Sequence, residues 1–148
     1  MAKWHKVFLA AAIGAAIVST GGYAVAQADV IKARKAGFQM NKDAMAAIKK
    51  AVDAGGPATA VVAPAEAIAA WAAKIPAHFP KGSDQGDTKA KADIWAKWSD
   101  FEKAAKANEE AAVKLVAAAK AGDMDAVKAG FGAVGASCGG CHKPFRND

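Results

Sequence analysis

The stretch AGDMDAVKAGFGAVGASCGGCHKPFR, residues 121–146, decides the fold. Its apolar side chains recur at alternating spacings of three and four, which is the period of one face of an α-helix. This face comprises Met124, Val127, Phe131, Val134, Cys138, Cys141 and Phe145. Gly122 is suited to end a preceding helix, and Asp123 is suited to cap this one. The pattern predicts a helix that carries both cysteines inward, with His142 on the same side, four residues after Cys138.

Another helix is predicted near the start, from Asp29 to about Val52. Asp29 is suited to cap it, and the run Gly55–Pro57 is suited to end it. Apolar residues recur every seven positions along this segment, so they form one buried stripe. The stripe comprises Ile31, Phe38, Met45 and Val52, with Ile48 beside them.

Two further helices are predicted between these. One lies within Ala58–Lys74, with Pro64 in its first turn, and the other extends from a cap at Thr88 to about Ala121. Residues 75–88 form the one long loop. The inner faces of the two helices comprise Ile68, Trp71 and Ala72, and then Ile94, Trp98, Phe101 and Ala105. Because no run is typical of a strand and most connections are short, we predict an all-α, antiparallel four-helix bundle.

The first 26 residues are typical of a cleaved signal peptide. Lys3 and Lys6 precede an apolar run, and Ala24-Val25-Ala26 is a small-x-small cleavage site, with Ala28 an alternative. We therefore expect export to the periplasm and a single mature domain, residues 27–148, without a membrane span. Cleavage lowers the formal charge from +6 to +4. We interpret that charge as spread along the chain, and no basic stripe with aromatics indicates a nucleic-acid partner.

The sequence CGGCH, residues 138–142, permits four interpretations. A zinc site normally needs four ligands, and the mature chain adds His78 alone to these three. A redox-active dithiol of the thioredoxin type follows a strand, and none is predicted here. A disulfide between Cys138 and Cys141 closes too small a loop to contribute much stability. The fourth is covalent haem attachment, for which C-x-x-C-H is the signature: the thiols bind one porphyrin edge, and His142 projects toward the iron. We favour haem c.

The function then depends on what lies on the other side of the iron. Met40 points away from the buried stripe, Met124 lies too far along its helix, and a lone loop histidine such as His78 is more often solvated. Met45 points inward, although its commoner role is core filling. Alternatives therefore remain: a sixth ligand from these residues would make an electron carrier, and an open side would make a gas-binding site.

Arg34 lies beside the buried stripe, one turn before Phe38. A buried arginine needs a partner, and a haem propionate would accept its hydrogen bonds; a snorkelling arginine at the surface is the alternative. If Arg34 holds a propionate, Phe38 covers the haem face without ligating the iron.

Three segments carry a resemblance to a known family: VIKARKAGF (30–38), TKAKADIWAKWSDF (88–101) and residues 121–146. Together they resemble the cytochromes c′, the class II cytochromes c with a C-terminal haem motif. Residues 57–64 depart from the family's usual turn after the first helix, so the resemblance does not identify the dimer surface. Gly139-Gly140 makes the haem motif unusually flexible.

The resemblance implies one covalently attached haem c, with Cys138 and Cys141 as thioethers and His142 as the axial iron ligand. It also implies a five-coordinate, high-spin protein that binds NO and CO, exchanges electrons with redox partner proteins and forms a homodimer. Because the sequence offers no paired acid and base, nucleophile constellation or phosphate loop, we do not expect an enzyme. Relatives with methionine at the distal position are low-spin electron carriers, so that function is the alternative. Further cofactor-binding positions implied are Arg34, Lys35 and Lys89 at the propionates or haem edge, Phe38 as the distal cap and Arg146 on the proximal side.

Overall fold

The computed structural model describes the backbone of residues 20–148 and the side chains of residues 27–148. The expected signal sequence lies largely outside the described residues, so it stays a prediction. Within the described part the chain is helical and contains no strand. Its main helices are α1 (Thr20–Asp53), α2 (Val62–Ala72), α4 (Trp98–Lys120) and α5 (Met124–Phe145). The short helical turns are η1 (Ala58–Val61), η2 (Pro76–His78) and α3 (Asp93–Ala96).

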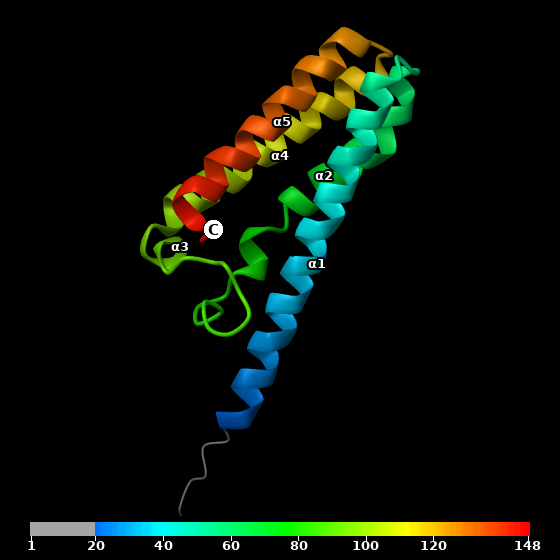
Figure 1. Ribbon diagram of the computed structural model, residues 1–148. Coiled ribbons are helices and arrows are strands. Elements are labelled where there is room, and N and C mark those ends of the chain that lie inside the picture. The colour runs from blue at the N-terminus through cyan, green and yellow to red at the C-terminus, as the bar shows by residue number, and fades with distance from the viewer. Residues whose placement is uncertain (1–19) are drawn as a thin grey trace, which may run out of the picture.

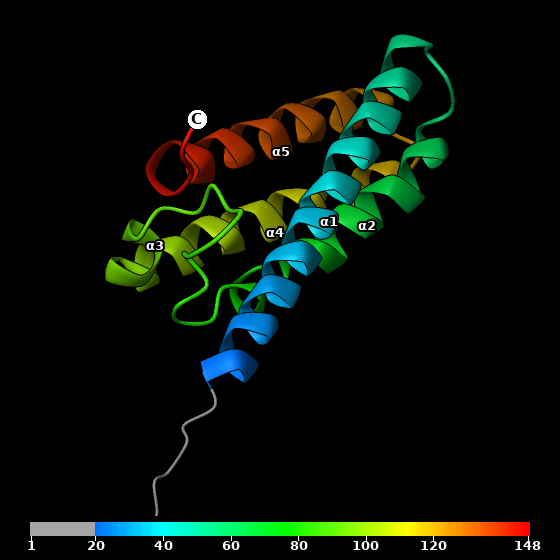
Figure 2. The same cartoon turned by 60° about the horizontal axis from the view of Figure 1, so that its bottom comes forward.

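The four main helices alternate in direction along the bundle (Figure 1). Helix α4 packs along both α5 and α2, and α1 packs mainly on α2. The C-terminus lies beside the segment that joins α2 to α3 (Figure 2), where the Asn147 amide donates a hydrogen bond to the Lys89 carbonyl at 2.8 Å. This arrangement confirms the predicted antiparallel four-helix bundle. In the described part of the chain, no helix is long and apolar enough to cross a membrane.

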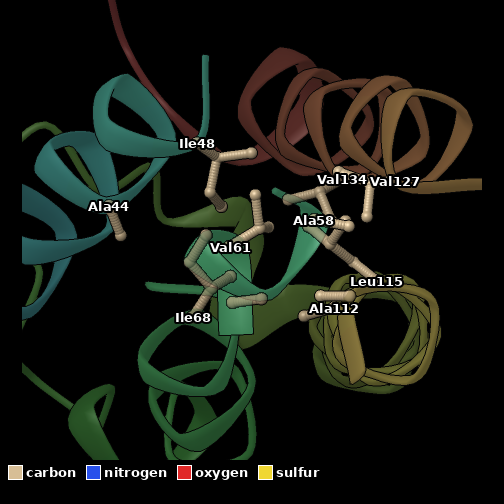
Figure 3. Close-up of a cluster of buried hydrophobic side chains, with 11 residues drawn as sticks. Ala44, Ile48, Ala58, Val61, Ile68, Ala112, Leu115, Val127 and Val134 are labelled. Carbon is tan, nitrogen blue, oxygen red and sulfur yellow. The ribbon is translucent and has the colours of Figure 1, made fainter. Parts of the chain in front are cut away.

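One core cluster fills the end of the bundle near the α1–α2 and α4–α5 connections. All four main helices and η1 contribute side chains that converge in this layer (Figure 3). Ile48, Val61, Leu115, Val127 and Val134 are fully buried. They include residues of the stripes predicted for the first and last helices, so the period of three and four identified the inner face correctly.

A second core cluster is aromatic and lies toward the other end of the bundle. It is built around Phe101, Trp71, Phe79 and Phe145, all buried, with Ile94 beside them. Phe101 contacts Phe79 and Phe145 with ring centroids 4.8 and 5.5 Å apart. The face predicted for the third helix is therefore buried as expected.

Two boundary predictions are wrong. Asp29 does not cap α1, because the helix already begins at Thr20 and continues through it. The third helix is not continuous from Thr88. Thr88 instead accepts hydrogen bonds on its hydroxyl from the Ala90 amide and from Arg34, and the backbone departs from helical geometry at Lys97, which separates α3 from α4.

The turn before α5 is as predicted. Gly122 has φ 75°, a left-handed conformation in which glycine is favoured. The Asp123 carboxylate accepts a hydrogen bond from the Ala126 amide at 2.9 Å, which caps the helix. This cap fixes where α5 begins, and therefore which of its faces carries the cysteines.

Candidate functional site

A cavity of about 620 Å³ lies between α1 on one side and α4 and α5 on the other, next to the aromatic cluster. Protein interiors contain few voids larger than a water molecule, and this volume falls in the range of roughly 300–1,000 Å³ that cofactor sites occupy. All eight residues predicted to hold or cover a cofactor line it. They are Arg34, Lys35, Phe38, Lys89, Cys138, Cys141, His142 and Arg146.

Cys138 and Cys141 reach the cavity from consecutive turns of α5. Both are half-buried free thiols, so they do not form the disulfide considered above. Burial raises the pKa of Cys138, and burial together with the neighbouring Cys138 raises that of Cys141 to about 11. The thiols are therefore protonated at neutral pH and weakly nucleophilic by themselves. That state does not suit a redox-active dithiol.

Asn108 on α4 supports Cys138, and the predicted site did not include it. Its side chain is 5% exposed, and its amide donates to the Ser137 hydroxyl at 2.8 Å and contacts the Cys138 sulfur at 3.7 Å. Ser137 in turn donates to the Val134 carbonyl at 2.7 Å. A signal for Asn108 existed, because it lies three residues after Ala105 on the inner face of the third predicted helix.

His142 lines the cavity, yet the residue is exposed to solvent, which is more open than the inward placement predicted from the sequence. Burial lowers the pKa of its imidazole, and the nearby positive charge of Arg146 lowers it further. The lowered pKa favours the neutral imidazole, which is the form that binds a metal. Arg146, expected on the proximal side, follows the end of α5 in extended geometry and pairs with Ala90.

Phe38 reaches the cavity from α1 and faces His142 across it. The two ring centroids are 6.5 Å apart. Phe38 also contacts Phe79 and Trp71 edge-on, at 6.4 and 5.5 Å. Trp71 was expected only as an inner-face residue of the second helix. Its contact with Phe38 is a part of the site that the sequence did not reveal.

Arg34 is buried, with 3% of its surface exposed, so the snorkelling alternative is wrong. Its guanidinium donates to the Ser83 hydroxyl at 2.9 Å, to the Ser83 carbonyl at 2.7 Å and to the Thr88 hydroxyl. It also lies over the Phe79 ring, 4.6 Å from the centroid. Burial lowers its pKa, whereas Asp84 raises it. Arg34 thus ties the loop after η2 to α1 at the edge of the cavity.

The excess positive charge is spread along the sequence, as expected, but the fold gathers it around the cavity. Residues 27–148 retain 18 basic and 14 acidic side chains after Lys3 and Lys6 are removed. Five basic residues and one acidic residue line the cavity, and the other basic and acidic residues balance. The fold brings together residues far apart in sequence, which are Arg34, Lys35, Lys42, Lys89 and Arg146, with Asp87.

The candidates for a second iron ligand separate clearly. Met45 lines the cavity, whereas Met40, Met124 and His78 do not. Met40 is 37% exposed, as its azimuth predicted. His78 instead packs on Trp71, with ring centroids 4.7 Å apart. Among residues whose placement is described, no three His, Cys, Asp or Glu side chains gather as a metal site.

The comparisons with known proteins agree with this geometry. The family model described as cytochrome c′ matches residues 29–146. The chain belongs to the cytochrome c′ family. A cytochrome c′ of Rhodopseudomonas palustris is 36% identical to it, over 92% of this chain and 94% of that protein. The cytochrome c′ of Rhodospirillum rubrum is 41% identical over a shorter alignment, which covers 57% of this chain and 58% of that protein.

Solved cytochromes c′ share the fold. The crystal structure from Thermochromatium tepidum has a TM-score of 0.78 and 33% identity, covering 82% of this chain and 97% of that one. The nitric oxide complex of a cytochrome c′ variant from Alcaligenes xylosoxidans has a TM-score of 0.75 and 31% identity, covering 82% and 97%. Cytochromes c′ carry one covalently bound haem c, which is therefore the cofactor of this chain. The size of the cavity and its two free thiols fit that group.

Proposed function

We propose that residues 27–148 act in the periplasm as a high-spin cytochrome c′ that binds NO and CO and exchanges electrons. One observation carries the proposal. Cys138, Cys141 and His142 on α5 share a single cavity with Phe38 on α1. A cysteine thiol would add its S–H bond across a haem vinyl group to form a thioether, and an imidazole nitrogen is suited to bind the iron. We assign Cys138 and Cys141 to the thioethers and His142 to the iron.

Phe38 is assigned to the opposite face. Its ring brings no ligating atom, so a bound haem would have His142 as its protein ligand and an apolar side chain over its other face. When bound, the haem supplies the iron that takes up a diatomic gas or an electron. Phe38 excludes water and larger anions, and a small uncharged gas enters when the ring moves. The nitric oxide complex of the Alcaligenes variant supports the proposed binding of NO by similarity.

Arg34, Lys35, Lys89 and Arg146 are assigned to the propionates and the haem edge, as the resemblance implied. Their charge also favours approach of an acidic redox partner. Lys35 pairs with Asp87 at the rim, so it is partly neutralised there. No acid, base or nucleophile constellation on the described residues suggests turnover, and we propose a binding and electron-transfer protein, not an enzyme.

We also propose a homodimer. One similar solved cytochrome c′, with a TM-score of 0.78 and 33% identity, is described as having ligand-controlled dimer dissociation. Sedimentation of the mature chain with and without CO tests both the dimer and its response to the ligand. A monomer at all micromolar concentrations would contradict the dimer.

The central experiment is spectroscopic. The mature chain, expressed with haem-maturation machinery, is expected to gain the mass of one haem and to give a haem c spectrum after alkaline pyridine treatment. Its oxidised form should give a high-spin EPR signal, and its reduced form should bind CO. An unchanged polypeptide mass rejects the cofactor assignment, and a purely low-spin signal rejects the open site.

The second candidate function is a low-spin electron carrier with Met45 as sixth ligand. It rests on the finding that Met45 lines the cavity, about two helical turns after Phe38 on the same stripe of α1. Replacing Met45 with leucine separates the two candidates. If the site is open, the variant should keep the spectrum of the parent. If Met45 binds the iron, the variant should change from low-spin to high-spin.

A further inference from the structure

Trp71 on α2 is placed to limit how far Phe38 moves. The two rings meet edge to face, with centroids 5.5 Å apart and an interplanar angle of 82°. Trp71 is 8% exposed and does not line the cavity. It therefore contacts the side chain that covers the cavity and not the space where a ligand would bind.

The backbone of α1 holds the Trp71 ring in this position. A Cβ atom built on Gly37 would lie only 2.1–2.3 Å from three atoms of the six-membered ring. The ring thus rests directly on α1, at the residue that precedes Phe38. On its other side it packs on His78, with centroids 4.7 Å apart. Glycine is needed here for close approach, because any side chain would displace the ring.

Packing alone holds the indole. Its Nε1 is buried and has no hydrogen-bond partner among the described residues. Buried tryptophans usually have such a partner, so the ring lacks the polar contact that would fix its position. Its resistance to displacement then depends on the contacts with Phe38, Gly37 and His78.

Another aromatic neighbour of Phe38 is fixed more firmly than Trp71. Phe79 lies 6.4 Å away and is itself clamped between the Arg34 guanidinium, at 4.6 Å, and the Phe101 ring, at 4.8 Å. Movement of Phe38 toward Phe79 therefore meets a rigid surface. Movement toward Trp71 meets a ring that packing alone retains.

We propose that Trp71 is a positioning residue that sets the rate at which CO and NO enter, by holding Phe38 over the cavity. This inference rests on the proposed role of Phe38 as the distal cover. An edge-to-face aromatic pair contributes about 0.5–1.5 kcal/mol. If opening breaks this pair, its loss raises the rate of CO association by about 2- to 10-fold.

The test is CO association with the reduced holoprotein after flash photolysis. Trp71→Leu is expected to speed association by that factor, and Trp71→Phe, which keeps an aromatic ring and folds more readily, by less. Trp98→Leu is the matched control, because Trp98 packs on Phe101 with centroids 5.4 Å apart and does not line the cavity. It should lower thermal stability and leave the CO rate unchanged.

A double-mutant cycle with Phe38→Ala shows whether Trp71 acts through Phe38. Phe38→Ala alone should speed CO association, and adding Trp71→Leu to it should produce no further increase. If Phe38→Ala speeds association but neither Trp71 variant does, the inference is wrong and the proposed cover stands. If Phe38→Ala has no effect, the cover itself is wrong. Additive effects of the two changes would also overturn the inference.

Discussion

The ring of Phe38 lies 6.5 Å from the imidazole of His142, although α1 and α5 have few other contacts nearby. The two residues are 104 positions apart in the chain. One is apolar and brings no ligating atom, and the other is an imidazole whose pKa is lowered by partial burial and by Arg146. This pairing gives the two faces of the site different chemistry, which a gas-binding haem requires and a six-coordinate electron carrier does not.

The first prediction concerns His142. Because its side chain is partly open to solvent, the variant His142→Gly should leave room for a free imidazole beside α5. The thioethers should retain the haem in this variant, its absorption spectrum should change, and added imidazole should restore the parent spectrum. The parent protein at the same imidazole concentration is the control. Loss of covalent haem from the variant, or no response to imidazole, would argue against His142 as the axial ligand.

The second prediction concerns the loop that Arg34 holds. Arg34→Met removes the hydrogen bonds to Ser83 and Thr88, and bonds to a charged donor contribute about 1.5–3 kcal/mol. We expect the free energy of unfolding to fall by about that amount, and trypsin to cleave faster at Lys81. Lys35→Ala, which removes an exposed ion pair at the same loop, should have no measurable effect. Equal proteolysis of both variants would contradict the clamp.

The sequence predicted those features of the fold that are encoded locally. The stripe of α5 repeats within a single segment, and the cap at Asp123 needs only the next three residues. The break at Lys97 was missed because no glycine or proline marks it. Shortly before the break, the Lys91 amide donates to the Phe145 carbonyl and the Asn147 amide donates to the Lys89 carbonyl, and these contacts with the C-terminal segment are not visible in the local sequence.

The candidate site divides in the same way. Cys138, Cys141 and His142 were predicted from a motif of five consecutive residues. The hydrogen-bond partners of Arg34, in contrast, lie 49 and 54 residues away in the sequence. The contact of Trp71 with Phe38 also depends on two helices crossing at one glycine. Such partners depend on how the helices pack together, and a single sequence does not specify that packing residue by residue.

The third prediction uses the close approach at Gly37. Gly37→Ala forces a Cβ into the Trp71 ring, and such overpacking costs about 1–3 kcal/mol. In a Trp71→Leu background the ring is gone, so the same change should instead stabilise, by up to about 1 kcal/mol, through higher helix propensity. Urea unfolding measures both. Gly132→Ala, where a Cβ meets no atom within 4 Å, should stabilise both backgrounds equally. Destabilisation of both backgrounds by Gly37→Ala would contradict the ring contact.

The fourth prediction concerns the positive charge around the cavity. Lys89→Glu should slow oxidation of the reduced protein by ferricyanide several-fold at low ionic strength, because attraction steers an anion to the cavity. The difference should vanish near 1 M salt, where the screening length is about 3 Å. Lys114→Glu is the matched control: it changes the net charge equally, but Lys114 is an exposed residue of α4 that does not line the cavity. Equal slowing by both variants would show that net charge alone acts.

The last prediction tests the support that Asn108 gives to Cys138. In Asn108→Asp, a buried carboxyl replaces a donor that faces the Ser137 hydroxyl, whose own proton is directed to Val134. Burial disfavours the carboxylate, so the folded-state pKa rises above the unfolded value of about 3.9. The variant should therefore be nearest to the parent in stability near pH 4 and lose stability as the pH rises toward 7. Ala107→Asp, at an exposed neighbouring position, should show no such dependence. A pH-independent loss in Asn108→Asp would mean that the introduced carboxyl reaches solvent, and that Asn108 does not form a buried contact behind the thiol.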